Sequence, residues 1–182
     1  YVFDGKLNEP YNENSKTSPL NHYGYSKEMG EKHMIKINPS KSIIIRTSWL
    51  YSSYGNNFVN TILEISKKNK KIKIIDDQIG SPTYAGDLAN AIIKIIPKIK
   101  NENVEIFHYS NEGSCSWYDF AISILKIKKI YSSVERAKTE DFNYKAIRPA
   151  YSILDKSKIK EKYNLIIPKW KKSLKYFLTK VL

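Results

Sequence analysis

The run Ser42-Ile43-Ile44-Ile45-Arg46-Thr47-Ser48-Trp49 indicates the fold class of the chain. Its apolar residues follow one another without alternation, which is typical of a fully buried strand in a parallel sheet. Polar residues come directly after it, at the end of the strand where doubly wound sheets bind their ligands. Thr47, Ser48 and Trp49 are therefore candidate site residues by position, although a tryptophan here can also serve as a core residue.

A helix is expected before this strand, over residues 22–37, with Asn21 as its N-cap. Tyr23 and Lys27 are four residues apart, which places both side chains on one face of that helix. A cation held beside a phenol favours its ionised form, and such a pair can pass a proton to or from an alcohol or carbonyl oxygen. Gly30, near the same face, would let another element approach closely.

The spacing of Tyr23 and Lys27 is weak evidence when taken alone. The chain has 14 Tyr, and 31 basic residues of which only three are Arg, so chance predicts about as many Tyr-x-x-x-Lys pairs as the two present. The second pair, Tyr176 and Lys180, lies in an amphipathic segment where the tyrosine is expected in the core and the lysine in solvent. The first pair needs support from its surroundings.

Strand and helix patterns alternate along the rest of the chain, which favours an α/β fold. Helices are expected at 56–69, at 84–97 with Thr83 as N-cap, from Ser114 or Ser116 to about 128, and near 155–163 and 170–181. Strands are expected at 72–75, 104–110 and 131–138, with His108 as a core histidine. Asp76 and Asp77 are expected in a solvated turn, so no metal site is predicted.

Composition limits the class of protein. With 182 residues, 41% hydrophobic and 27% charged, the chain can bury one good-sized core and a small lobe. The single cysteine, Cys115, excludes an internal disulfide and suggests a reducing compartment, so a cytoplasmic location is expected. No apolar run approaches the length of a membrane span.

The net charge of +13 raises the question of nucleic-acid binding. Arginine is scarce, and the lysines are spread along helix faces instead of clustering with aromatic residues. That distribution argues against a nucleic-acid partner. A positive surface would nevertheless attract an anionic nucleotide.

The surroundings of Tyr23 and Lys27 resemble the extended short-chain dehydrogenase/reductase superfamily and, within it, the dTDP-4-dehydrorhamnose reductases. The resemblance rests on motifs that follow in order at compatible spacings across nearly the whole chain. They are Tyr1-Val-Phe-Asp-Gly5, Pro10-Tyr-Asn-Glu13, Ser18-Pro-Leu-Asn21, Tyr23-Gly24 with Ser26-Lys27, Arg46-Thr-Ser-Trp49, Gly55-Asn-Asn-Phe58, Asp77-Gln78, Pro82-Thr83, Asp87-Leu-Ala89, Ser116-Trp-Tyr118, Arg148-Pro149 and Pro168-Lys-Trp170.

The resemblance implies a partial doubly wound, Rossmann-like parallel sheet with a smaller α/β substrate-binding lobe. Residues 1–75 would be the carboxyl-terminal half of an NAD(P)-binding domain. Residues 76–182 would mainly form the substrate lobe, with segments returning to the sheet. No Gly-x-x-Gly-x-x-Gly phosphate-binding turn is found. The expectation is therefore that the amino-terminal half of the domain is absent and that the chain by itself is inactive.

The resemblance also implies an activity. NADPH or NADH would reduce the C4 keto group of dTDP-4-dehydro-6-deoxy-L-mannose to give dTDP-L-rhamnose. Tyr23 would protonate the C4 oxygen, and Lys27 would hold the nicotinamide ribose and favour the ionised phenol. Thr47 and Ser48 would lie beside the nicotinamide. The residues expected to position the sugar nucleotide are Tyr1, Trp49, Asn57, Phe58 and Arg148.

Several alternatives stay open. Tyr1 could be a core aromatic residue, and Arg148 could form a structural salt bridge instead of binding a diphosphate. The whole protein could be a non-catalytic subunit resembling the regulatory subunit of methionine adenosyltransferase, or a sibling sugar-nucleotide epimerase or dehydratase. The resemblance leaves room for a homodimer without specifying one.

Overall fold

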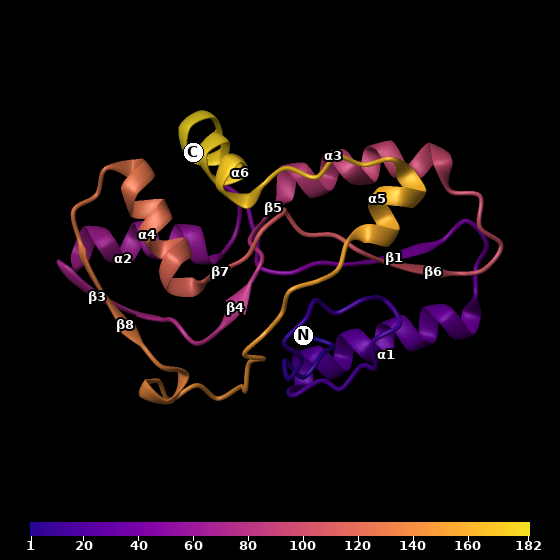
Figure 1. The fold of residues 1–182 in the computed structure, drawn as a ribbon, viewed down its shortest axis with the longest axis horizontal. Coiled ribbons are helices and arrows are strands. Elements are labelled where there is room, and N and C mark those ends of the chain that lie inside the picture. Colours follow the sequence, from indigo (N-terminus) through magenta and orange to yellow (C-terminus); the bar gives the residue numbers. More distant parts are fainter.

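The computed structural model describes residues 1–182, which form two lobes (Figure 1). In the first lobe, β1 (Ile43–Arg46) and β6 (Glu105–His108) pair in parallel. Helix α1 (His22–Ile37) lies on one side of this pair, and α3 (Ala85–Ile95) and α5 (Ser157–Tyr163) lie on the other. β1 is half-buried instead of fully buried, because β6 is its only strand partner and its other edge is open.

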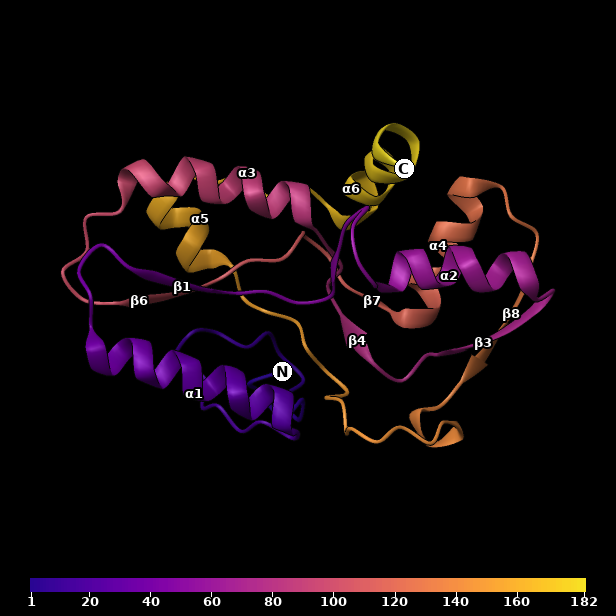
Figure 2. The same cartoon turned by 180° about the vertical axis from the view of Figure 1, so that it is seen from behind.

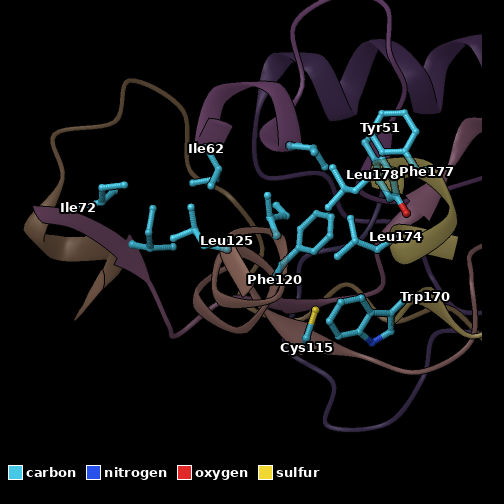
Figure 3. Packing of buried hydrophobic residues seen from close by; sticks show 14 residues of the cluster. Tyr51, Ile62, Ile72, Cys115, Phe120, Leu125, Trp170, Leu174, Phe177 and Leu178 are labelled. Carbon is cyan, nitrogen blue, oxygen red and sulfur yellow. The ribbon is translucent and has the colours of Figure 1, made fainter. Parts of the chain in front are cut away.

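In the second lobe, β3 (Lys71–Ile75) and β8 (Ser133–Ala137) pair in parallel beside α2 (Phe58–Lys68) and α4 (Trp117–Lys128). Its core joins these helices to α6 (Trp170–Tyr176) and to the π-helical segment Phe177–Val181 (Figure 3). Phe120, Leu174 and Phe177 are completely buried there. Tyr176 is 56% exposed, so its prediction as a core residue was wrong, because the neighbouring Phe177 and Leu178 fill the core instead.

Short strands connect the lobes. β2 (Leu50–Tyr51) pairs in parallel with β5 (Thr83–Tyr84), and β4 (Ile79–Gly80) pairs antiparallel with β7 (Cys115–Ser116). Short 3₁₀ segments at Ile96–Lys98 and Thr139–Asp141 complete the elements. Parallel pairs covered by helices confirm the predicted α/β class. None of the helices has the length and apolar character that crossing a lipid bilayer would require.

The helix starts show which local signals decided the structure. Asn21 caps α1, since its side chain accepts a hydrogen bond from the Gly24 N–H at 2.8 Å. Ser116 caps α4 in a capping box with Asp119. The predicted Thr83 cap was wrong: Thr83 pairs with Leu50 in β5, and α3 starts only at residue 85.

The close approach predicted at Gly30 of α1 occurs instead at Gly24. A side chain at Gly30 would meet no atom within 4 Å, so the predicted close approach at that position was wrong. At Gly24, a Cβ would collide with the Tyr1 carbonyl oxygen and lie 3.0 Å from Pro19. The amino-terminal segment therefore packs directly on the first turn of α1, and only glycine allows this contact.

A buried polar network ties α1 to the sheet. The Arg46 guanidinium donates to both Glu31 carboxylate oxygens, with Nε–Oε1 at 2.8 Å and Nη2–Oε2 at 2.6 Å. His108 is completely buried, with Nε2 3.3 Å from Arg46 Nη1 and Nδ1 3.0 Å from the Tyr11 carbonyl oxygen. A neutral imidazole protonated at Nδ1 satisfies both contacts, so His108 is the core histidine that was predicted.

Lowering the pH is expected to destabilise the protein through His108. Burial, and then the neighbouring Arg46 guanidinium, lower the pKa of His108 from 6.5 to about 4. At a pH between these two pKa values, His108 binds a proton in the unfolded chain but not in the folded chain. The free energy of unfolding therefore falls as the pH falls. From pH 7 to pH 5 the loss is about 2 kcal/mol.

Urea-induced unfolding at both pH values, compared with His108→Gln, measures this effect. The variant removes the imidazole but leaves every carboxylate in place. Between pH 7 and pH 5, the free energy of unfolding of the variant is expected to fall by about 2 kcal/mol less than that of the unsubstituted protein. Equal pH dependence in the two proteins would contradict the assignment of a neutral His108.

Candidate active site

A cleft of about 280 Å³ opens at the carboxyl end of β1. Helix α1 runs antiparallel to β1, so its first turn lies at this same end (Figure 2). The cleft brings together residues from both lobes. Its lining includes Tyr1, Tyr23, Thr47, Ser48, Trp49, Gln78 and Trp117.

Tyr23 lines the cleft, and Lys27 lies next to Tyr23 on α1 without lining the cleft itself. Tyr23 is 59% exposed and lines the cavity, so its hydroxyl is not part of the hydrophobic core. The Lys27 Nζ lies 5.2 Å from the centre of the Tyr23 ring. The ring of Tyr1 meets that of Tyr23 edge to face, with centroids 5.7 Å apart. A phenol and an ammonium group are therefore adjacent and accessible to a ligand.

Thr47 and Ser48 differ in what their hydroxyl groups can do. The Ser48 hydroxyl donates to the Ser81 carbonyl oxygen at 2.9 Å, so its proton is already used in a hydrogen bond within the protein. The Thr47 Oγ1 is buried and has no hydrogen-bond partner, although Thr47 lines the cleft. An unpaired buried hydroxyl is costly unless a ligand or water satisfies it.

Trp49 lines the cleft instead of filling the core. Its backbone is in the left-handed region, with φ of +47°. Its indole stacks on that of Trp117, with ring centroids 3.4 Å apart and planes 6° apart. Trp117 was named within the Ser116-Trp-Tyr118 motif and was not predicted as a site residue. Its position directly after the Ser116 cap, at the helix end nearest the cleft, was the signal that could have identified it.

A larger cleft of about 600 Å³ lies on the other side of Tyr1 and Trp117, which line both cavities. Phe58 lines this second cleft, but Asn57 does not. The Asn57 side chain caps α2, accepting from Asn60 N–H at 3.2 Å and donating to the Ser52 carbonyl oxygen at 2.8 Å. The neighbouring Asn56, which was not predicted, faces the cavity.

Arg148 also lines the larger cleft. Its guanidinium lies 4.5 Å from the centre of the Tyr144 ring, and no carboxylate lies within 4.0 Å of it. The structural salt bridge considered for Arg148 is therefore not formed. Its hydrogen-bond donors remain available for an anionic ligand.

Asp76 and Asp77 are held by neighbouring side chains. Asp76 forms an ion pair with Arg136, and Asp77 accepts hydrogen bonds from the Thr139 N–H and hydroxyl. Burial opposes ionisation, but the hydrogen bonds from Thr139 keep the pKa of Asp77 below its usual value. No group of three potential metal ligands occurs in the chain.

The fold is that of the Rossmann-like reductases and epimerases. The family described as RmlD substrate binding domain matches residues 1–182, and the chain belongs to this family.

Individual relatives agree with this assignment. The spore coat polysaccharide biosynthesis protein SpsK of Bacillus subtilis strain 168 is 40% identical over 98% of this chain and 61% of its own length. A dTDP-4-dehydrorhamnose reductase of Aggregatibacter actinomycetemcomitans is 41% identical over 96% of this chain and 62% of its own. The chain thus spans about three fifths of these curated relatives.

A solved structure is similar over the whole chain. The dTDP-4-dehydrorhamnose reductase of Bacillus anthracis strain Ames, in complex with NADP, aligns with a TM-score of 0.91 at 39% identity. The alignment covers 100% of this chain and 63% of that one. The arrangement of the two lobes is therefore shared with a dTDP-4-dehydrorhamnose reductase solved in complex with NADP.

Proposed function

We propose that the intact protein containing this chain is an NAD(P)H-dependent reductase of a dTDP-4-keto sugar. Its substrate would be dTDP-4-dehydro-6-deoxy-L-mannose and its product dTDP-L-rhamnose. The observation that carries the proposal is the adjacent, accessible Tyr23 and Lys27 at the carboxyl end of β1. The relatives named dTDP-4-dehydrorhamnose reductase support the choice of substrate.

The residues present fit a nicotinamide cofactor on this side of the cleft. The unpaired Thr47 hydroxyl would gain a partner from the carboxamide or ribose, and Lys27 is placed to hold ribose hydroxyls. Residues 1–75 would thus form the cofactor side and residues 76–182 mainly the substrate side. When bound, the reduced nicotinamide would supply the hydride to C4. NADPH is the proposed form, since the relative from B. anthracis binds NADP.

Tyr23 would act as the general acid. As the C4 carbonyl is reduced, negative charge develops on its oxygen, and the phenol proton moves to that oxygen to give the alcohol. The Lys27 ammonium would stabilise the phenolate left behind by Coulomb attraction at short range. The Tyr1 ring, packed edge to face on Tyr23, would restrict the phenol to the cleft.

The two clefts would divide the sugar nucleotide between them. The smaller cleft, with the Trp49 indole, would hold the sugar ring. The larger one would hold the nucleotide, with Phe58 and Tyr144 beside the base and Arg148 forking onto the diphosphate. The linkage between the two parts would pass between Tyr1 and Trp117, which line both cavities.

Oxidation of NADPH by the intact protein in the presence of the keto sugar nucleotide tests this proposal. Absorbance of the reduced nicotinamide should fall in step with formation of dTDP-L-rhamnose, detected by chromatography. UDP-linked keto sugars of the same configuration serve as the comparison for nucleotide choice. Binding of NADPH and dTDP without any turnover would refute the reductase and favour a non-catalytic binding protein.

A further inference from the structure

We propose that Gln78 is a positioning residue that fixes Trp117 and, through it, the Trp49 indole on which the sugar would lie. This inference rests on the proposed function for the identity of the ligand. Trp49 follows β1 in the first lobe, and Trp117 begins α4 in the second. The stacked indoles therefore join the two lobes at the point where both clefts meet.

The hydrogen bonds of Gln78 define a single orientation of its carboxamide. The side chain is almost completely buried, with Oε1 accepting from Trp117 Nε1 at 3.2 Å and Nε2 donating to Thr139 Oγ1 at 3.0 Å. Thr139 in turn donates its hydroxyl proton to Asp77 Oδ1 at 2.7 Å. An indole N–H can only donate and a carboxylate can only accept, so the whole chain of bonds can run in one direction only.

Trp49 depends on this arrangement because it has no polar anchor of its own. Its Nε1 makes no hydrogen bond within the chain, and its ring is held by stacking on Trp117 and by contact with Gly80. A Cβ at Gly80 would lie 2.6 Å from the Trp49 Nε1. Phe58 packs against Trp117, with centroids 4.5 Å apart. Movement of Trp117 therefore removes the support of the Trp49 ring.

Loss of the Gln78 side chain should affect substrate binding but not the chemical step. Gln78 touches neither Tyr23 nor Lys27, which lie on α1, so its loss should leave proton delivery intact. Its loss should instead weaken binding of the sugar, because the indole offers a flat apolar face only while it is held in place. The signature of Gln78 is a rise in KM with kcat nearly unchanged.

The test compares the intact protein with Gln78→Met, which keeps the length of the side chain but removes both hydrogen bonds. The chain has three tryptophans, so a proton–nitrogen correlation spectrum gives one indole N–H signal for each within this chain. The Trp117 signal should move upfield on losing its acceptor, and the Trp49 signal should move with it. The Trp170 signal, from a buried residue at the start of α6, should stay in place as an internal reference.

KM for the sugar nucleotide should rise roughly fivefold to tenfold in Gln78→Met, with kcat within about twofold of the unsubstituted protein.

A double-mutant cycle shows whether Gln78 acts through Trp117. Trp117→Phe keeps an aromatic ring against Trp49 but lacks the N–H group. Gln78→Met added to this variant should raise KM no further. Thr139→Val, at a partly exposed position, removes the next bond of the chain and should shift KM and the Trp117 signal in the same direction. It provides the test if Gln78→Met does not fold.

Asn101→Ala is the matched control. It removes a carboxamide that donates to the Ser42 carbonyl oxygen at 2.7 Å, at the opposite end of β1 from the cleft. Its KM and its Trp49 and Trp117 signals should match those of the unsubstituted protein. An unmoved Trp117 signal or an unchanged KM in Gln78→Met would overturn the inference. If the unsubstituted protein reduces no sugar nucleotide, the proposed function fails, and the indole signals alone decide whether Gln78 holds the two rings.

Discussion

Tyr23→Phe is expected to lower kcat of the intact protein by about 10²–10⁴-fold, the usual contribution of a positioned general acid. The variant keeps the ring that Tyr1 and Lys27 contact and removes only the hydroxyl. KM for the sugar nucleotide should change little, because the lost interaction matters as charge develops on the C4 oxygen. Initial rates of NADPH oxidation over a range of substrate concentrations measure both quantities.

Tyr25→Phe is the control for this experiment. Tyr25 lies on the same helix and is 53% exposed, close to the 59% of Tyr23, but it does not line the cleft. Its removal should leave kcat unchanged. If Tyr23→Phe retained the rate of the unsubstituted protein, another group would have to deliver the proton.

Arg46→Met is expected to have the largest effect on stability, lowering the free energy of unfolding by about 3–5 kcal/mol. Side chains of Arg46 and Glu31 are only 8% and 12% exposed, so the variant leaves a buried carboxylate without its partner. Arg46 also lies over the Phe3 ring at 5.1 Å and donates toward His108. The variant therefore removes a side chain that contacts α1, β6 and the amino-terminal segment. Urea-induced unfolding of the intact protein measures the loss.

Two further variants show whether the loss of stability comes from leaving a buried charge unpaired or from losing any ion pair. Lys162→Met breaks the pair with Glu105, whose side chains are 46% and 24% exposed, and should cost no more than about 1 kcal/mol. The double variant Arg46→Met with Glu31→Leu removes both buried charges and should recover most of the lost stability. Equal losses from Arg46→Met and Lys162→Met would contradict the structural role assigned to the buried pair.

Local signals in the sequence were sufficient for the helices and for the fold class. Asn21 and Ser116 are polar residues directly before apolar periodic segments, and both cap their helices as predicted. Thr83 met the same criterion and failed, because a strand pairing with Leu50 competes for it. Gly30 and Gly24 are equally permissive in sequence, and only the packing of the amino-terminal segment distinguishes them.

The candidate site was accessible to sequence reasoning where its residues follow a strand or share a helix face. Tyr23, Thr47 and Trp49 were found in this way, and the structure places them around one cleft. The stacking of Trp117 on Trp49 and the hydrogen bonds of Gln78 were missed, because these contacts join residues 39 or more positions apart. Such contacts depend on how the two lobes meet, which no local pattern encodes.

The left-handed backbone of Trp49 has a consequence for engineering. A residue with a side chain costs roughly 1–2 kcal/mol in this conformation, and glycine avoids that cost. Glycine would relieve this strain but would also remove the indole that stacks on Trp117. Deleting a well-packed aromatic side chain costs about 3–5 kcal/mol, which is more than the strain that glycine would relieve. Packing therefore keeps tryptophan in a backbone conformation that favours glycine, and libraries meant to raise heat resistance should leave this position unchanged.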